Sequence, residues 1–281
     1  MQNIITDSIT NTIANPANMS ILTCQSSCIS NAALATFFNT TLNAAAFKDY
    51  CPNGLQVEGT PTIRKLATAV SASLSAIQAA AVWGADALLV HHGIVWRGED
   101  GTLIGFRRAR VKALLGANIN LFAYHLPLDA HPTLGNNAQL GAKLGFVTTG
   151  QCGENNIVWL GTPNSATFSA KILCDHISQV LGREALVLGD AVINANRSIK
   201  TVAWCTGGAQ NYFEDAIAAG ADVFITGEVS EQHTHIARET GVAFIAAGHH
   251  ATERFGVQAL GAFAATELGL EWRHFEDENP V

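Results

Sequence analysis

The sequence predicts an α/β protein made of two similar lobes with mainly parallel sheets. Short runs rich in aliphatic and β-branched residues alternate with runs of helical spacing, which is typical of βαβ units. Part of this alternation occurs twice, because Gly84-Ala85-Asp86-Ala87-Leu88-Leu89 matches Gly220-Ala221-Asp222-Val223-Phe224-Ile225. With 281 residues, 48% of them hydrophobic, the chain can form one large domain or two modest ones.

The first helix is expected at 32–47, and the turn Cys51-Pro52-Asn53-Gly54 follows it. In the first lobe we expect strands at 66–70, 87–90 and 119–124, and helices at 72–83, 107–115 and 136–144. In the second lobe we expect strands at 201–204, 223–226 and 243–246, and helices at 211–219, 231–239 and 252–268. The pattern between the lobes is less regular, with one helix near 165–180. This divides the chain into a first lobe at 29–149, a middle segment at 150–198 and a second lobe at 199–281.

Composition narrows the class of protein. The net charge of −7 argues against a nucleic-acid surface, because phosphate binding needs clustered cations. No stretch is apolar enough for a membrane span, and the first thirty residues lack the pattern of a signal peptide. We therefore expect a cytoplasmic protein without membrane contact. Residues 1–28 have little hydrophobic periodicity and are expected to be loosely ordered or an extension. The six cysteines form no C-x-x-C pair and are interpreted as reduced thiols.

Histidines and acids follow the predicted strands. In a parallel sheet, ligands bind at the carboxyl ends of strands, where loops converge. Successive strand side chains point to opposite faces, so we expect the strand at 87–90 to end at the adjacent pair His91-His92. The residues at these strand ends are His91, His92, His125, Asp129, His249 and Glu253.

The residue types at these ends suit a pair of metal ions. Imidazole and carboxylate without thiolate favour zinc, manganese or iron(II). An open catalytic zinc site usually has three protein ligands. A larger set suits two divalent ions roughly 3.5–4 Å apart. The predicted metal-binding residues are His91, His92, Asp129, His249 and Glu253. A histidine at one strand end is more often a hydrogen-bonded structural residue, and this is the preferred interpretation for His131, His176, His233 and His274.

A glycine-rich turn, Cys205-Thr206-Gly207-Gly208-Ala209, lies between a predicted strand and helix. Its backbone N–H groups could hold an anion, although the Gly-Lys-Ser/Thr of a P-loop is absent. A tight turn without a ligand is the alternative. Glu228 occupies the place in the second lobe that the histidine pair has in the first. Candidate substrate-binding residues are thus Gly207, Gly208 and Glu228, with helix capping as the alternative role of Glu228.

Five motifs carry a resemblance to a known family. They are Asp49-Tyr50-Cys51-Pro52-Asn53-Gly54-Leu55-Gln56-Val57, Val90-His91-His92-Gly93, His125-Leu126-Pro127-Leu128-Asp129, Thr226-Gly227-Glu228 and Gly248-His249-His250-Ala251-Thr252-Glu253. From about residue 30 to the end, the chain resembles the Nif-three-like dinuclear-metal proteins, named GTP cyclohydrolase I type 2 homologues.

The resemblance implies a division of the metal-binding residues. It implies that His91 and Asp129 hold one ion, and that His92 and His249 hold the other. Glu253 would bridge the two ions. It also implies that His249, and not His250, is the ligand.

The resemblance implies further roles and an assembly. His125 and His235 would support the site or transfer protons, which makes them the candidate catalytic residues. The two lobes would be intertwined, with the dinuclear site between them. The chain would form a homohexamer, with the metal sites facing an internal cavity.

Two functions are compatible with these features. The first is a metal-dependent hydrolase that acts on a nucleotide or a related small molecule, because two ions activate water and polarise the group attacked. The second is a non-catalytic hexamer that binds metal or a partner, with a structural or regulatory site. The surplus of ionisable residues favours catalysis, since purely structural sites are usually closed.

Overall fold

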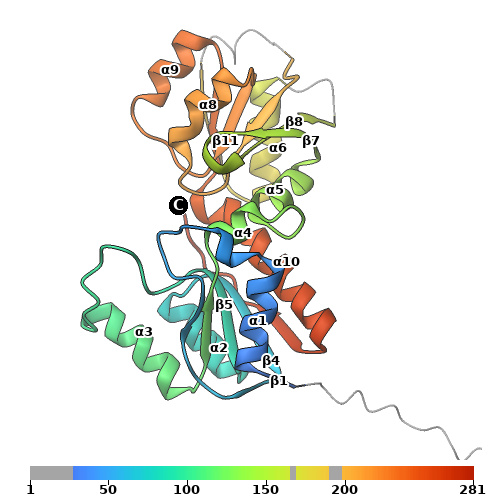
Figure 1. Cartoon of the computed structure of the whole chain (residues 1–281). Coiled ribbons are helices and arrows are strands. Elements are labelled where there is room, and N and C mark those ends of the chain that lie inside the picture. Colours follow the sequence, from blue (N-terminus) through green and yellow to red (C-terminus); the bar gives the residue numbers. More distant parts are fainter. Residues whose placement is uncertain (1–27, 165–168, 190–197) are drawn as a thin grey trace, which may run out of the picture.

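The computed structural model describes residues 28–164, 169–189 and 198–281 and confirms the predicted α/β fold. Two lobes lie one above the other, each with a central sheet covered by helices (Figure 1). Within the described residues, no helix combines the length and apolar character that a membrane crossing needs. The predictions for residues 1–27, and for the start of the helix near 165–180, lie outside the described residues.

The first lobe contains a five-stranded sheet in the order β13-β4-β5-β6-β2. Its four parallel strands are β4 (Lys65–Ser71), β5 (Ala87–His92), β6 (Asn120–Ala123) and β13 (Glu271–His274), and β2 (Gly54–Val57) is antiparallel to β6. A short pair, β1 (Ile29–Ser30) and β3 (Thr62–Ile63), lies beside it. The helices of this lobe are α1 (Asn31–Thr41), α2 (Leu74–Trp83) and α3 (Gly105–Gly116), with the short turn η1 (Ala44–Ala46).

Alternation along the strands places helices on both faces of this sheet. Leu66 and Leu89 share a buried cluster with residues of α1 and of the last long helix, α10 (His249–Leu268). The neighbouring Ala67 and Leu88 face the other way and pack with α2 and α3. Because both faces are covered, the strands are apolar throughout, as expected for buried parallel strands.

The second lobe contains a six-stranded sheet in the order β7-β8-β10-β11-β12-β9. Its strands are β7 (Phe146–Cys152), β8 (Val158–Pro163), β9 (Leu186–Leu188), β10 (Val202–Trp204), β11 (Val223–Thr226) and β12 (Ala243–Ala246). The three central strands, β10, β11 and β12, are parallel to one another, whereas β8 pairs antiparallel with β10, β7 with β8, and β9 with β12. Its helices are α5 (Asn136–Leu144), α6 (Ala170–Leu181), α8 (Phe213–Ala218) and α9 (His233–Thr240), with the turns η2 (Glu154–Asn156) and η3 (Gln210–Tyr212).

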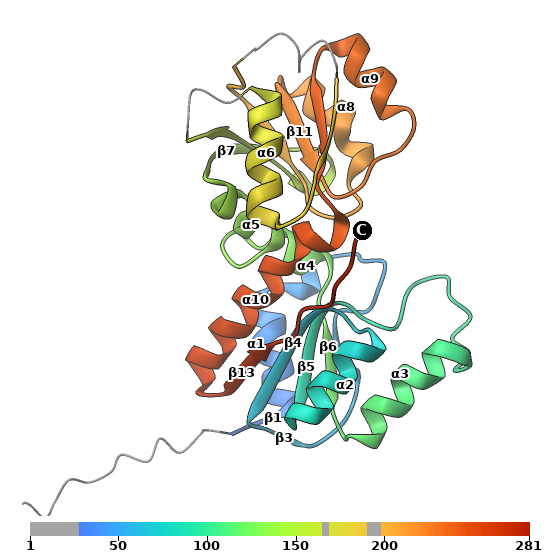
Figure 2. The ribbon, with the colours of Figure 1, turned by 180° about the vertical axis from the view of Figure 1, so that it is seen from behind.

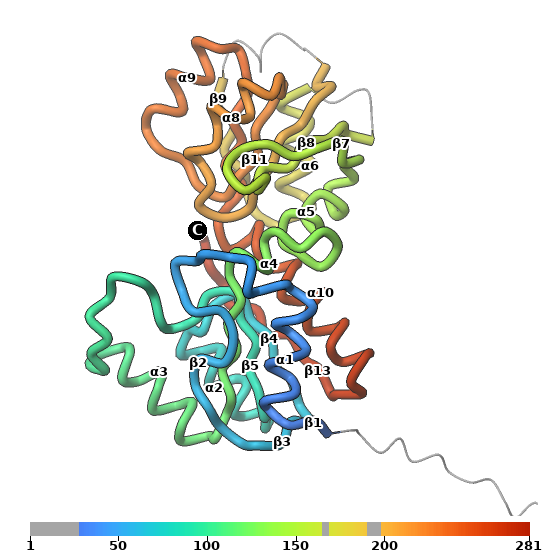
Figure 3. Tube along the Cα trace, in the orientation of Figure 1, coloured from blue at the N-terminus to red at the C-terminus, as the bar shows by residue number. Residues whose placement is uncertain are grey.

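The path of the chain links the lobes twice. It leaves the first lobe through α4 (Leu126–Ala130) and α5, and it returns through α10, which starts at the junction and runs down beside β13 (Figure 2). Helix α10 has 20 residues and therefore extends about 30 Å. Its lower part lies next to α1 (Figure 3), where the rings of Phe37 and Phe263 are 5.7 Å apart.

The boundaries between the two lobes therefore differ from those that the sequence pattern predicts. The predicted second lobe, 199–281, includes α10 and β13, yet both pack in the first lobe, because Val257 and Leu260 complete its core and β13 pairs with β4. The predicted middle segment, 150–198, supplies β8 and β9 to the second sheet. The lobes are therefore intertwined through the last helix and strand.

Most elements lie within about two residues of their predicted limits, and three depart from them in ways that affect the site or the path of the chain. Strand β5 does not end before the histidine pair but includes both His91 and His92. Helix α10 begins at His249, three residues earlier than predicted. Helix α1 ends at Thr41, because Asn43 adopts a left-handed conformation with a φ of 47°. The alanines after Asn43 continue the helical spacing in the sequence but form only a short turn.

The internal repeat has a structural basis. Asp86 Oδ2 accepts hydrogen bonds from the backbone N–H groups of Arg64 and Lys65 at 2.8 and 2.9 Å. Asp222 Oδ2 does the same for the N–H groups of Lys200 and Thr201, also at 2.8 and 2.9 Å. Each aspartate thus ties the end of a helix to the start of the neighbouring strand.

We expect Asp86→Ala and Asp222→Ala each to lower the free energy of unfolding by about 1–3 kcal/mol, because two backbone donors lose a charged acceptor. The control is Asp175→Ala, which removes an exposed ion pair with Lys171 and should change stability by no more than about 0.5 kcal/mol. Urea unfolding followed by circular dichroism measures all three variants. Equal midpoints for Asp86→Ala and the control would contradict this role.

Candidate metal centre

The predicted metal-binding residues meet at the junction of the lobes. His91 and His92 end β5, Asp129 lies on α4, and His249 and Glu253 occupy the first turns of α10. Their potential ligand atoms form two groups that share Glu253. The groups are His91, Asp129 and Glu253, and His92, His249 and Glu253, with the atoms of each group within 4.8 Å of one another. We call these five residues the junction cluster.

Glu253 lies at the centre of the junction cluster. Its Oε1 is 3.5 Å from His91 Nε2, and its Oε2 is 3.2 Å from His92 Nε2 and 3.0 Å from His249 Nε2. The side chain is only 3% exposed, and Oε2 has no hydrogen bond of normal geometry among the described residues. A buried carboxylate is costly unless positive charge compensates it. The cluster therefore has the composition and the central acceptor that divalent cations require.

The three imidazoles are oriented by contacts on their far side. Each ring uses Nδ1 for a supporting contact, and this leaves Nε2 directed towards Glu253. The contacts are His91 Nδ1 to Tyr124 O at 3.0 Å, His92 Nδ1 to Ser71 Oγ at 3.1 Å, and His249 Nδ1 to Glu228 Oε1 at 2.6 Å. Metal-binding histidines commonly have such partners, which fix the tautomer and the ring orientation. Glu228 therefore contacts the cluster by holding His249.

Two buried asparagines that the sequence pattern does not single out support Asp129. Asn136 Nδ2 donates to Asp129 Oδ1 at 2.8 Å, and Asn136 Oδ1 accepts from Gly256 N at 3.0 Å. Asn137 Nδ2 donates to the backbone carbonyl of Asp129 at 3.3 Å, and Asn137 Oδ1 accepts from Thr206 N at 2.9 Å. The available signal is the Asn-Asn pair in the first turn of α5, since asparagine in a buried helical position needs tertiary partners.

Burial and neighbouring charges shift the pKa values of the cluster residues in different directions. Burial lowers the pKa of His92 to about 3. Burial also acts against a charge on His91 and on His249, but nearby carboxylates prevail and raise the pKa of each to about 9. Burial raises the pKa of Asp129, whereas the pKa of Glu253 falls well below its usual value because His91 and His92 outweigh its burial. Without ions, protons thus compensate the carboxylates, and metal binding has to displace them.

His125 borders the junction cluster. It precedes α4, and its ring centroid is 5.0 Å from that of His91 and 5.8 Å from that of His92. His125 Nδ1 donates to Asp49 Oδ1 at 2.7 Å. Burial opposes the charge of Asp49, but hydrogen bonds from His125 and Asn53 lower its pKa to about 2. Asp49 belongs to the first of the five motifs, but nothing in the sequence pattern assigns it a role.

The family model Duf34/NIF3 (NGG1p interacting factor 3) matches residues 30–280. The chain belongs to this family. The "GTP cyclohydrolase 1 type 2 homolog" of Neisseria meningitidis serogroup B is 53% identical over 247 residues, which cover 88% of this chain and 97% of the relative.

Solved structures of the Duf34/NIF3 fold agree with the architecture. The structure of the protein ybgI, described as of unknown function, has a TM-score of 0.85 and 45% identity, covering 90% of this chain and 100% of that one. TTHA1606 from Thermus thermophilus has a TM-score of 0.76 and 30% identity, with the same coverage.

Two other histidines of this Duf34/NIF3 chain point away from the cluster. His250 Nε2 is 2.6 Å from Glu276 Oε1, on the side of the C-terminal segment. His235 lies on α9 with a side chain that is 60% exposed, and its ring contacts Glu231 at 3.1 Å. Among the described residues, the groups that could hold a metal include neither histidine. The structure therefore does not bring the catalytic candidate His235 to the site.

The glycine-rich turn supports the cluster through close packing. A Cβ atom on Gly207 would overlap Glu253 Oε1, and the residue has a φ of +69°. The N–H of Gly207 already donates to Thr252 Oγ1 at 3.0 Å, so it is not free for an anion. At Gly208 a Cβ would be 3.5 Å from the Glu228 carboxyl group, an ordinary contact. The tight-turn interpretation therefore agrees with the geometry at Gly207.

We expect Gly207→Ala to displace Glu253 and to weaken metal binding by roughly 10- to 100-fold, the usual cost of disturbing groups that support ligands. Gly208→Ala is the matched control and should keep its metal. Metal content per chain, measured by plasma mass spectrometry after identical purification, compares the two. Equal metal content in both variants would show that close packing at Gly207 does not maintain the site.

Proposed function

We propose that the chain is a hydrolase that depends on two divalent ions and acts on a nucleotide or a related small molecule. The observation that carries this proposal is the convergence of three Nε2 atoms on the buried carboxylate of Glu253. In this proposal His91 and Asp129 hold one ion, His92 and His249 hold the other, and Glu253 bridges them. Zinc, manganese and iron(II) suit this ligand set.

The surroundings of the cluster favour catalysis over a purely structural site. A pair of such ions acidifies water and polarises the group that is attacked. His125 has a ring nitrogen within 4.8 Å of ring nitrogens of His91 and His92, and its Nδ1 donates to Asp49 Oδ1 at 2.7 Å. This bond holds a proton on Nδ1 and leaves Nε2 able to accept or return one. A purely structural site has no need of a histidine held in this way.

The proposed substrate class is based on the chemistry of two metal ions and on the names of curated relatives. Curated relatives bear the name "GTP cyclohydrolase 1 type 2 homolog", so GTP is the first compound to test. Other nucleotides and simple phosphoesters use the same activated water with a different placement of the scissile bond. We therefore propose a small, polar, nucleotide-like substrate.

We expect His125→Ala to reduce metal-dependent turnover by roughly 10²- to 10⁴-fold, the usual contribution of a general acid–base residue. Its metal content should stay near that of the wild-type protein, because the proposed role is proton transfer. His235→Ala is the control and should keep full turnover, since its ring faces solvent.

The assay compares hydrolysis of GTP, other nucleotides and phosphoesters with added manganese, zinc or iron. Loss of metal in His125→Ala would instead make His125 a ligand. If the metal-loaded protein gives no turnover across this panel, the non-catalytic function, a hexamer that binds metal or a partner, is the better account.

We also propose that the chain assembles as a homohexamer, as the family resemblance implies. Large apolar side chains on α2 and α3 remain exposed in the single chain, Val82 at 91% and Leu115 at 58%, and an assembly would cover surface of this kind. Light scattering at micromolar concentration should give the mass of six chains. The mass of one chain would exclude the hexamer.

A further inference from the structure

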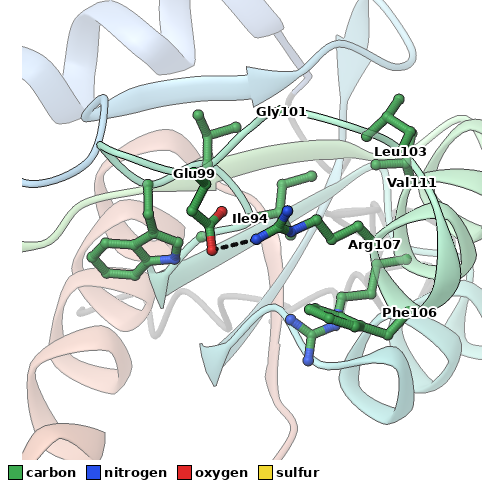
Figure 4. Close-up of a pocket in the computed structure, with 11 residues that line it drawn as sticks. Ile94, Glu99, Gly101, Leu103, Phe106, Arg107 and Val111 are labelled. Atoms are coloured by element: carbon green, nitrogen blue, oxygen red, sulfur yellow. Dashed lines mark ion pairs between the residues drawn. The ribbon is translucent and has the colours of Figure 1, made fainter.

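A cavity of about 190 Å³ lies beside the junction cluster, between the loop that follows β5 and helix α3. Figure 4 shows side chains that line this cavity, among them Ile94 from the loop and Leu103, Phe106 and Val111. Arg107 points towards Glu99. At ~30 Å³ for each water molecule of liquid, this volume suits a single or fused planar ring. Apolar and aromatic walls with a few polar groups are typical of small-molecule sites.

One residue that lines the cavity also lies close to the junction cluster. Trp96 lines the cavity, and its ring centroid is 5.9 Å from that of His92 and 5.2 Å from that of His125. The start of the loop is fixed, because Ile94 N donates to Gln56 Oε1 at 2.9 Å. A ligand in the cavity would therefore lie next to the proposed reaction centre.

The aromatic ring of Phe106, close to two guanidinium groups, forms the opposite side. The guanidinium carbon of Arg107 is 5.7 Å from the centre of the Phe106 ring, and that of Arg110 is 5.2 Å from it. Phe106 is 65% exposed, so part of the ring remains open to a ligand. Stacking on aromatic rings and on guanidinium planes is how proteins hold nucleobases.

The two arginines differ in their charge balance. Arg107 pairs with Glu99 at 2.6 Å and with Asp100 at 3.2 Å. Arg110 has no carboxylate within 4 Å in the described part of the chain, so its charge is available to a ligand. The charged residues that line the cavity are Glu99, Arg107 and Arg110, whereas Arg108 and Lys112 of α3 face α2, so the lining carries one net positive charge. This local positive charge favours an anionic ligand.

We propose that this cavity binds a phosphorylated planar heterocycle, that is, a nucleotide. The ring lies against Trp96 and Phe106, and the phosphate pairs with Arg110, whose planar guanidinium suits bidentate phosphate binding. The identification of this ligand with the substrate rests on the proposed function, whereas the binding itself does not.

Titration calorimetry with guanosine 5′-monophosphate tests the binding. We expect Arg110→Gln to weaken it by about 10- to 100-fold, the effect of losing a hydrogen bond to a charged group. The matched control is Arg108→Gln, which makes the same change on α3 but beside Leu74 and Gln78 of α2, and it should bind within about twofold of wild type. Ribose 5-phosphate, which lacks the ring, and guanosine, which lacks the phosphate, should both bind more weakly. Trp96→Leu should weaken the monophosphate but not ribose 5-phosphate.

Absence of binding, equal effects of the two arginine variants, or equal affinity for ribose 5-phosphate would overturn the proposal. Glu253→Gln separates it from the proposed function, since this variant should lose hydrolysis and keep monophosphate binding. If metal-dependent hydrolysis of GTP is found and Arg110→Gln leaves its KM unchanged, the hydrolase stands and the nucleotide site falls. If no hydrolysis is found but Arg110→Gln abolishes binding, the nucleotide site stands alone.

Discussion

The carboxylate of Glu253 is surrounded by three imidazoles at the junction of the lobes, and the Glu253 side chain is only 3% exposed. Isolated burial of such a charge is unfavourable, so the surrounding structure has to supply positive charge at fixed positions. Each imidazole is held from behind, by Tyr124, Ser71 or Glu228. The tight turn at Gly207 leaves the carboxylate the space it needs. The local geometry of the junction follows from the need to compensate this one group.

The same constraint accounts for the path of the chain. The junction cluster needs residues from β5 of the first lobe and from the start of α10, which follows the last strand of the second sheet. Helix α10 then packs its apolar face, including Val257 and Leu260, into the core of the first lobe. One helix thus fixes the position of Glu253 and joins the two lobes. Movement of one lobe relative to the other would separate His92 from His249, so the integrity of the site depends on the packing of the lobes.

Much of the fold and the choice of cluster residues follow from sequence, because strand ends converge in a parallel sheet. The five residues of the junction cluster are chemically distinctive and lie at the end of an apolar strand or in the helix that follows one. The residues that orient them are less visible, since Ser71 and Asn136 have many roles in proteins and acquire theirs only from tertiary contacts. The return of α10 to the first lobe is likewise a matter of packing, because its sequence pattern fits either lobe. The prediction that His235 lies near the site is based on the family resemblance alone. The structure instead places His235 on an exposed helix face.

The central claim is that Glu253 bridges two divalent ions. Crystals of the purified protein, measured on both sides of the zinc, manganese and iron absorption edges, would locate ions directly. The account predicts two anomalous peaks, roughly 3.5–4 Å apart, one between Glu253, His91 and Asp129 and the other between Glu253, His92 and His249. A single peak, or two peaks of which only one contacts Glu253, would contradict it.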